Sequence, residues 1–93
     1  MSIEFDARLG SALRRKREEK GFSQEYVAER IGVTKNSVSH WELGKRSMYA
    51  EQLEKCCRIL GCTMQEVFDE MEDAQATRFV YSKLLKEKEG IDL

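Results

Sequence analysis

Apolar residues recur every three to four positions along most of this 93-residue chain, which is the spacing of one face of an α-helix. The first such row is Phe5, Leu9 and Leu13, and Arg17 continues it at the edge of the same face. Alternation of the kind that strands show is absent, and no proline interrupts the pattern. The chain is therefore predicted to be all-α.

Glycines and small polar residues divide this pattern into helices over residues 5–20, 24–31, 35–43, 49–60 and 64–71. A glycine follows each of the first four segments, where a helix commonly ends on a left-handed residue. Ser23 and Thr34 are predicted to cap the second and third helices, and Thr63 with Glu66 forms a capping-box pattern before the fifth. Residues 24–43 therefore read as two short helices joined by a tight turn at Gly32.

The segment 35–43 has two different faces. Val38, Trp41 and Glu42 lie at i, i+3 and i+4 and share the side predicted to be buried. The opposite side carries mostly short polar or basic residues, and Lys35 lies at its N-terminal tip. The residues on this side are Asn36, Ser39, His40 and Leu43. Side chains of this kind can bond base edges, so the pattern is typical of a helix presented to the major groove of DNA.

A further helical stretch covers about residues 74–89 and carries an apolar stripe that includes Phe79, Val80, Leu84 and Leu85. We divide the chain into a domain over residues 1–71 and a helical extension over residues 72–93. The stripe either packs back on the domain as a sixth helix or forms a dimerisation surface. Dimerisation is favoured because the core already closes by Phe68, and a second copy is the commonest partner for such a surface. Whether residues 63–89 form one helix or two stays open.

Charge is distributed unevenly although the net charge is only −1. Residues 1–48 carry a net +3, and residues 49–93 carry a net −4. This asymmetry predicts one side that faces a polyanion and an acidic side that is solvated or meets a protein partner. A membrane span is not expected because no apolar run is long enough, and the acidic N-terminus does not resemble a signal peptide. We expect a cytoplasmic protein.

The cysteines Cys56, Cys57 and Cys62 lie within seven residues. They are interpreted as core or helix-surface residues, with a redox sensor and a metal site as alternatives. The only histidine, His40, is too distant in sequence to suggest a zinc spacing, and the chain contains no phosphate-binding glycine loop. We therefore expect no metal, no cofactor, no catalytic residues and no enzymatic activity.

The pattern S-Q-x-x-V-A-x-x-I-G-V-T-x-x-S-V-S-x-W-E-x-G-x-R, which runs from Ser23 to Arg46, resembles the helix-turn-helix of the lambda-repressor-like, or XRE/Cro, family. The resemblance extends over about residues 9–68 and ends with ILGCTMQEVF, which is similar to the closing segment of the family. It implies a compact bundle of about five helices that binds operator DNA, usually as a dimer. Met48 stands near a position where the family often has proline.

Candidate roles follow from the residue types and from this resemblance. The residues predicted to contact bases are Lys35, Asn36, Ser39 and His40. The residues predicted to contact phosphates are Gln24, Ser37, Lys45 and Arg46; such contacts fix register without reading sequence. The family has a buried ion pair at the positions of Arg17 and Glu42. The resemblance therefore implies such a pair here, which accounts for an acid, Glu42, on the inward side of the segment 35–43.

These expectations describe a sequence-specific regulator of transcription, a repressor that binds an inverted-repeat operator in double-stranded DNA as a homodimer. Two alternatives stay open. One is an antitoxin-type module that uses the same fold to bind a protein partner through the acidic C-terminal half. The other is a redox-responsive regulator that acts through the three cysteines.

Overall fold

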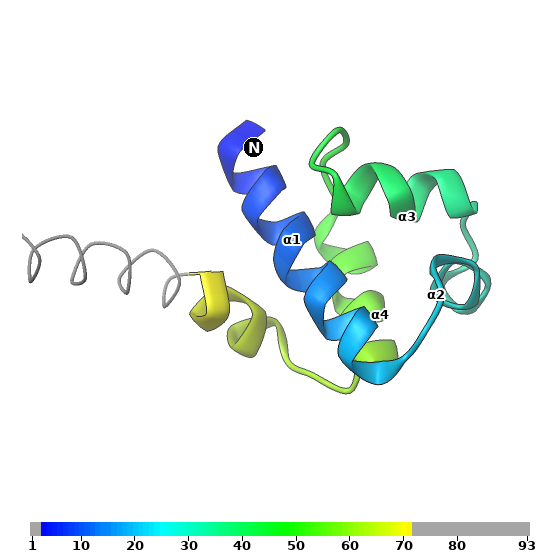
Figure 1. The fold of residues 1–93 in the computed structure, drawn as a ribbon. Coiled ribbons are helices and arrows are strands. Elements are labelled where there is room, and N and C mark those ends of the chain that lie inside the picture. The colour runs from blue at the N-terminus through cyan, green and yellow to red at the C-terminus, as the bar shows by residue number, and fades with distance from the viewer. Residues whose placement is uncertain (1–2, 72–93) are drawn as a thin grey trace, which may run out of the picture.

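A computed structural model describes residues 3–71 of the chain, and the remaining residues, 1–2 and 72–93, are outside that description. The described residues form α1 (Ile3–Lys20), α2 (Gln24–Ile31), α3 (Lys35–Glu42), α4 (Ala50–Leu60) and a helical segment over residues 64–71. They contain no strand, so the all-α prediction is confirmed with helix bounds close to those expected. Figure 1 shows α1 in the middle, with α2, α3 and α4 on one side and the segment 64–71 on the other.

The predicted capping residues start the two helices of the helix-turn-helix. The Ser23 hydroxyl accepts a hydrogen bond from the backbone N–H of Tyr26 at 3.0 Å, and the Thr34 hydroxyl accepts one from Ser37 at 3.2 Å. Between them Gly32 ends α2 with φ +88°, a left-handed conformation that glycine adopts without steric cost. These three residues place α3 directly after α2.

The crossing of α1 and α3 depends on Gly10, which lies inside α1. A Cβ atom at this position would lie 2.2 Å from the backbone oxygen of Trp41 and 2.6 Å from that of Glu42. The absence of a side chain therefore lets the last turn of α3 lie directly on α1. A glycine within a helix costs about 1 kcal/mol relative to alanine, and here the close packing of α3 accounts for it.

The core lies between α1, α2, α3 and α4, and the segment 64–71 adds Val67 and Met71 to it. Leu9 and Leu13 of α1 are buried as expected, whereas Phe5 is only half-buried. The buried apolar residues of the whole core are Leu9, Ala12, Leu13, Val27, Ala28, Val38, Trp41, Met48, Leu53, Cys56, Cys57, Leu60, Val67 and Met71.

The segment 64–71 packs against α1 and covers part of its polar side. The periodicity of the sequence alone places Lys16 on the outward side of this helix with its arginine neighbours, but only 18% of its side chain is exposed. Its ammonium lies 3.2 Å from Glu70, and Arg15 lies 2.8 Å from the same carboxylate. Partial burial alone would raise the pKa of the Glu70 carboxyl, but the hydrogen bonds from Arg15 and Lys16 lower it overall. Part of the basic surface of α1 is thus neutralised within the domain.

The C-terminal extension predicted over residues 72–93 lies outside the described residues. The dimerisation residues Phe79, Val80, Leu84 and Leu85 fall there, as does half of the acidic region considered as a partner surface. The division at residue 71 and the dimerisation surface therefore stay predictions.

Candidate nucleic-acid interface

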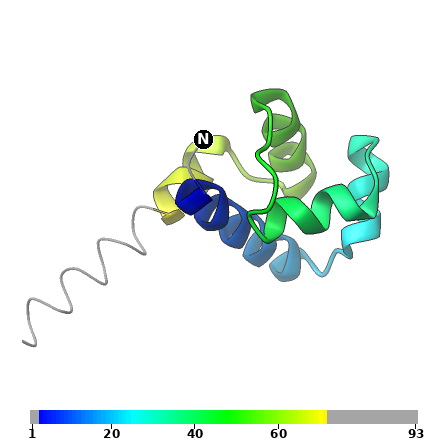
Figure 2. The ribbon, with the colours of Figure 1, turned by 90° about the horizontal axis from the view of Figure 1, so that it is seen from above.

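The outer face of α3 lies at the edge of the described molecule. Figures 1 and 2, which view the chain from two perpendicular directions, show no other described element over this side of the helix. Lys35 and Asn36 are exposed, and Ser39 and His40 are half-buried, so all four base-contacting candidates lie on one accessible strip. Leu43, which follows the helix, is 53% exposed and extends the strip with an apolar side chain.

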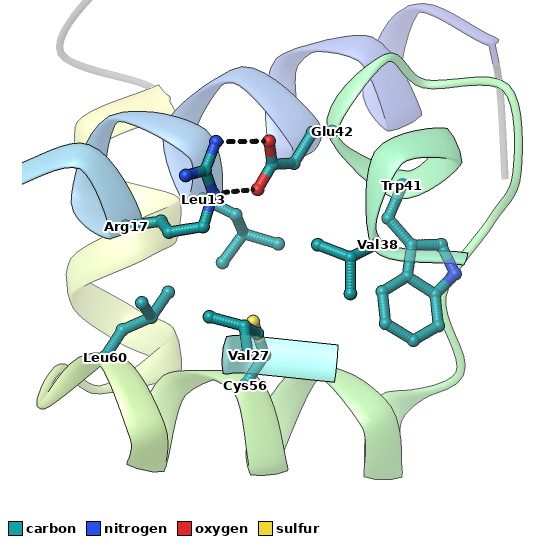
Figure 3. A pocket seen from close by; sticks show the side chains of 8 residues that line it. All are labelled: Leu13, Arg17, Val27, Val38, Trp41, Glu42, Cys56 and Leu60. Carbon is teal, nitrogen blue, oxygen red and sulfur yellow. Dashed lines mark hydrogen bonds and ion pairs between the residues drawn. The ribbon is translucent and has the colours of Figure 1, made fainter. Parts of the chain in front are cut away.

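The inner face of α3 is buried against the other helices. Figure 3 shows Val38 directed toward Leu13 of α1 and Val27 of α2, and Trp41 lines the same cavity together with Cys56 of α4. The cavity between these side chains has a volume of about 10 Å³, which is room for a single water molecule at most. The helix is therefore held rigidly from behind, and this cavity is too small to admit an effector.

Arg17 and Glu42 form the ion pair that the resemblance implied. The Nε of Arg17 donates to one carboxylate oxygen of Glu42 at 2.6 Å, and its Nη2 donates to the other at 3.0 Å (Figure 3). Only 12% of the Arg17 side chain and 6% of the Glu42 side chain are exposed. The hydrogen bond to Glu42 raises the pKa of the Arg17 guanidinium above its ordinary value. The acid on α3 is thus paired inside the domain and does not face the solvent beside the outer strip.

Gln24, the first residue of α2, lies beside this pair. Its amide Nε2 donates to Oε1 of Glu42 at 2.9 Å, so the side chain is half-buried rather than free at the surface. An amide nitrogen carries two hydrogens, and Glu42 accepts only one of them. The other remains available for a second acceptor next to the N-terminus of α2, where backbone N–H groups favour anions.

Ser37 and Arg46 meet on the opposite flank of α3. The guanidinium of Arg46 donates to the Ser37 hydroxyl at 3.0 Å, although the two residues are nine positions apart. The side chain of Arg46 thus reaches back to the first turn of α3. At 3.6 residues per turn Ser37 lies about 200° around the helix from Lys35, whose ammonium lies 3.7 Å from Glu25 of α2. The two flanks of the outer strip therefore both carry phosphate-contacting candidates.

The loop over residues 43–49, which carries Lys45 and Arg46, is fixed to α1 by residues that the sequence did not single out. Asp6, which is buried, accepts a hydrogen bond from the Ser47 hydroxyl at 2.6 Å. Gly44 has φ +74° and lies very close to Ala7. A Cβ atom on Gly44 would lie only 2.6 Å from the Cα of Ala7. An acid in the first turn of a helix reads as an ordinary dipole partner, so nothing in the sequence pattern marked Asp6 as a loop anchor.

Lys35 has an acidic neighbour on α2. Its ammonium lies 3.7 Å from the Glu25 carboxylate, and both side chains are exposed, at 58% and 75%. Ion pairs this exposed contribute about 0–1 kcal/mol at most, so the pair is easily exchanged for another acceptor. Lys35 is therefore oriented in the free domain but not committed to Glu25.

The three cysteines lie on the opposite side of the core from the outer strip. Cys56 and Cys57 are both buried, and Cys62 is half-buried. Burial raises the pKa of Cys56 and of Cys57 to about 12, and it also raises the pKa of Cys62. Because the thiolate is the reactive form, these thiols have the character of inert core residues rather than of sensors. Within residues 3–71 no group of histidines, cysteines and acids is arranged to hold a metal ion.

Comparisons with known proteins agree with this geometry. The family described as "Helix-turn-helix" matches residues 13–67. The control protein C.MunI of a Mycoplasma species is 38% identical over 66 residues, which cover 70% of this chain and 89% of that protein. Among solved structures, the clp gene regulator ClgR of Corynebacterium glutamicum has a TM-score of 0.74 at 28% identity, covering 89% of this chain and 92% of that one. The restriction-modification controller protein C.AhdI of Aeromonas hydrophila has a TM-score of 0.63 at 30% identity, covering 66% of this chain and 92% of that one.

No helix within residues 3–71 is long and apolar enough to span a membrane. The family match covers more than half of the chain and includes the two helices, the turn and the buried pair described above. The chain therefore belongs to the helix-turn-helix family of lambda-repressor-like DNA-binding regulators, which is a family of regulators and not of enzymes.

Proposed function

We propose that this protein is a sequence-specific repressor of transcription that binds an inverted-repeat operator in double-stranded DNA as a homodimer in the cytoplasm. The observation that carries the proposal is the arrangement of polar groups around α3. A strip of base-bonding side chains faces outward, and groups that can bond phosphate lie on both of its flanks. A helix lying in the major groove needs this order, with bases in front of it and a phosphate strand on each side.

Each side chain on the strip has a chemistry that suits one kind of contact. Lys35 can donate to guanine O6 and N7, and Asn36 can bond adenine N6 and N7. Ser39 and His40 lie further along the same strip and can reach base edges nearer the middle of the groove. Both Lys35 and Asn36 are in the first turn of α3, the part of a recognition helix that enters the groove most deeply.

Phosphate contacts are assigned to the two flanks. Gln24 supplies its second amide hydrogen on the side of α2. Ser37, Arg46 and Lys45 serve the other strand, where Arg46 is already drawn toward the first turn of α3 by Ser37. With net charge +3 in residues 1–48, non-specific attraction to DNA is modest, so base contacts and a second copy of the domain must supply the rest of the affinity.

A homodimer follows from this modest affinity of a single domain for DNA. One α3 covers only a few base pairs, whereas two copies related by a two-fold axis place their helices in successive major grooves about 34–36 Å apart. The operator is then an inverted repeat whose half-sites are centred about one helical turn apart. Repression follows if this site overlaps a promoter, because the bound dimer occupies the face of the DNA that polymerase requires.

The test begins with selection of bound duplexes from a random-sequence pool by the full chain, followed by sizing of the free protein and of the complex. We expect an inverted repeat and two chains per duplex. Insertion of five base pairs between the half-sites rotates them by about half a helical turn, and we expect it to weaken binding at least about tenfold. Replacement of the bases between the half-sites at constant length keeps both spacing and orientation, and it serves as the matched control for sequence disruption.

Two outcomes would contradict the proposal. Recovery of no preferred sequence at low salt would remove specific DNA recognition. A single half-site bound by one chain as tightly as the full repeat would remove the dimer. Repression is tested separately by placing the selected site across a reporter promoter, where a rise in transcription on expression of the chain would identify an activator.

A further inference from the structure

We infer that Glu42 is a positioning residue for DNA binding, because it holds the Gln24 amide in the orientation that presents a donor to phosphate. This inference rests on the proposed function and adds a residue that does not itself touch DNA. Glu42 is buried at the end of α3 and bridges the two helices of the motif to α1 through Arg17 and Gln24. Figure 3 shows the carboxylate of Glu42 directed toward the guanidinium of Arg17.

The chemistry of the carboxylate decides which end of the Gln24 amide faces inward. An amide can turn either its oxygen or its nitrogen toward a neighbour, and the two orientations occupy nearly the same volume. The ionised carboxylate of Glu42 accepts hydrogen bonds and donates none, so only the nitrogen of Gln24 can bond to it, at 2.9 Å. With the nitrogen held there, its second hydrogen is fixed in direction as well.

Arg17 keeps Glu42 in place for this task. It fills both carboxylate oxygens with donors at 2.6 and 3.0 Å, which is the two-pronged geometry that fixes orientation. The remaining nitrogen of the same guanidinium donates to the backbone oxygen of Phe22 at 2.7 Å, two residues before Gln24. Arg17, Phe22, Gln24 and Glu42 thus form a closed ring of contacts that joins the end of α1, the start of α2 and the end of α3.

The consequence is a phosphate donor that is oriented before DNA arrives. A glutamine free at the surface would lose more side-chain entropy on binding, because its amide would have to be oriented at that moment. Loss of Glu42 should therefore remove most of the contribution of Gln24 to DNA affinity, even where the domain stays folded.

A double-mutant cycle on the full chain tests this inference. The duplex is the one selected by the wild-type chain, and the readout is its dissociation constant. In the wild type, Gln24→Ala removes a hydrogen bond to a charged group, and we expect affinity to fall roughly tenfold. In an Arg17→Met, Glu42→Met background, where apolar side chains of similar length replace the ion pair, we expect Gln24→Ala to change affinity less than about twofold.

The outcomes separate this inference from the proposed function. A tenfold loss from Gln24→Ala in both backgrounds would show that Gln24 needs no help from Glu42 and would overturn the positioning alone. No effect of Gln24→Ala in the wild type would remove the phosphate contact and the inference with it. A wild-type chain that binds no duplex would overturn the proposed function itself. An Arg58→Met, Glu54→Met background is the matched control, because it removes an exposed ion pair on α4 and should leave the full effect of Gln24→Ala.

A measurement on the wild-type chain covers the case in which the double methionine variant does not fold. The two amide hydrogens of Gln24 should give separate, slowly exchanging NMR signals in the free protein, and on addition of duplex only one should move strongly. Gln65, whose amide nitrogen donates to Asp69 at 2.8 Å on an exposed helix surface, provides the comparison. Gln24 hydrogens that exchange as fast as those of Gln65 would overturn the inference.

Discussion

The two faces of α3 differ in how much of their geometry is fixed before any partner binds. On the inner face, Val38, Trp41 and Glu42 are buried, and Glu42 has three hydrogen-bond donors around its carboxylate. On the outer face, Lys35 and Asn36 are exposed, and the ion pair that involves Lys35 is weak. The same eight residues thus pack against the core on one side and leave an exposed recognition surface available for binding on the other.

This difference teaches how a helix of only eight residues can read DNA. A helix so short is unstable alone, so its shape must come from packing. Packing on the inner face supplies that shape, which leaves the exposed outer residues, Lys35 and Asn36, with little part in stability. Substitutions on the two faces should therefore separate cleanly, with inner changes affecting unfolding and outer changes affecting binding.

The largest expected effect is that of Glu42→Ala. Removal of the carboxylate leaves the guanidinium of Arg17 buried without its partner, and we expect the free energy of unfolding to fall by about 3–5 kcal/mol. Urea denaturation followed by circular dichroism measures this change. The matched control is Glu54→Ala, which breaks the exposed pair between Glu54 and Arg58 on α4 and should cost less than about 1 kcal/mol. Equal losses in the two variants would contradict the structural role assigned to the buried carboxylate on the inner face of α3.

The buried thiols behind α3 give a pH dependence with a definite sign. Burial raises the pKa of Cys56 and Cys57 to about 12, whereas an exposed thiol titrates near 8.5, so the unfolded chain loses these protons first. Above about pH 9 the unfolded state binds fewer protons, and the free energy of unfolding must fall as pH rises. We expect a loss of about 1–2 kcal/mol per thiol by pH 10.

Urea denaturation at pH 8 and pH 10 measures this loss, with a Cys56→Ala, Cys57→Ala variant as the control that corrects for the tyrosines and lysines. The variant should lose less stability between the two pH values than the wild type does. An equal loss, or rapid alkylation of all three thiols in the folded chain at pH 8, would restore a redox role for the cysteines.

The outer face predicts an effect of the opposite kind. Asn36→Ala should leave the free energy of unfolding within about 0.5 kcal/mol of the wild type, because the side chain is exposed. Its cost should appear in binding, as about 1–3 kcal/mol lost on the selected duplex with a relaxed preference at one base pair. Comparison of the selected duplex with a scrambled one, by fluorescence anisotropy, gives the specificity ratio. An unchanged ratio would show that Asn36 does not read a base.

The sequence predicts the inner face well because packing repeats along a helix. The spacing of Val38, Trp41 and Glu42 predicts their common burial, and the capping residues predict where α2 and α3 begin. The pairing of Arg17 with Glu42 needed the family resemblance in addition, since periodicity alone leaves Arg17 only at the edge of a buried row. All of these features are local or repeat with a period that the chain itself displays.

What the sequence does not predict are contacts that join distant segments through single residues. Asp6 anchors Ser47 across 41 positions, and Lys16 turns inward because Glu70 is brought over it by a helix far along the chain. Neither residue breaks the pattern of its own helix, so no local signal marks it. Gly10 did carry a signal, since a glycine inside a helix is costly, but the partner that approaches it could not be named from sequence.

The smallest effect is expected from the loop beyond α3 and concerns phosphate alone. Lys45→Ala removes an exposed charge and should weaken binding to the selected and the scrambled duplex by the same factor, leaving their ratio unchanged. The slope of the logarithm of affinity against the logarithm of salt concentration should become shallower by about 1 for each chain bound. Lys55→Ala, which removes an exposed lysine from α4, is the matched control and should leave that slope unchanged. A Lys45→Ala variant that loses affinity for the selected duplex alone would move Lys45 from the phosphate flank to the base-reading strip. The boundary between base-contacting and phosphate-contacting residues would then lie beyond the C-terminal end of α3.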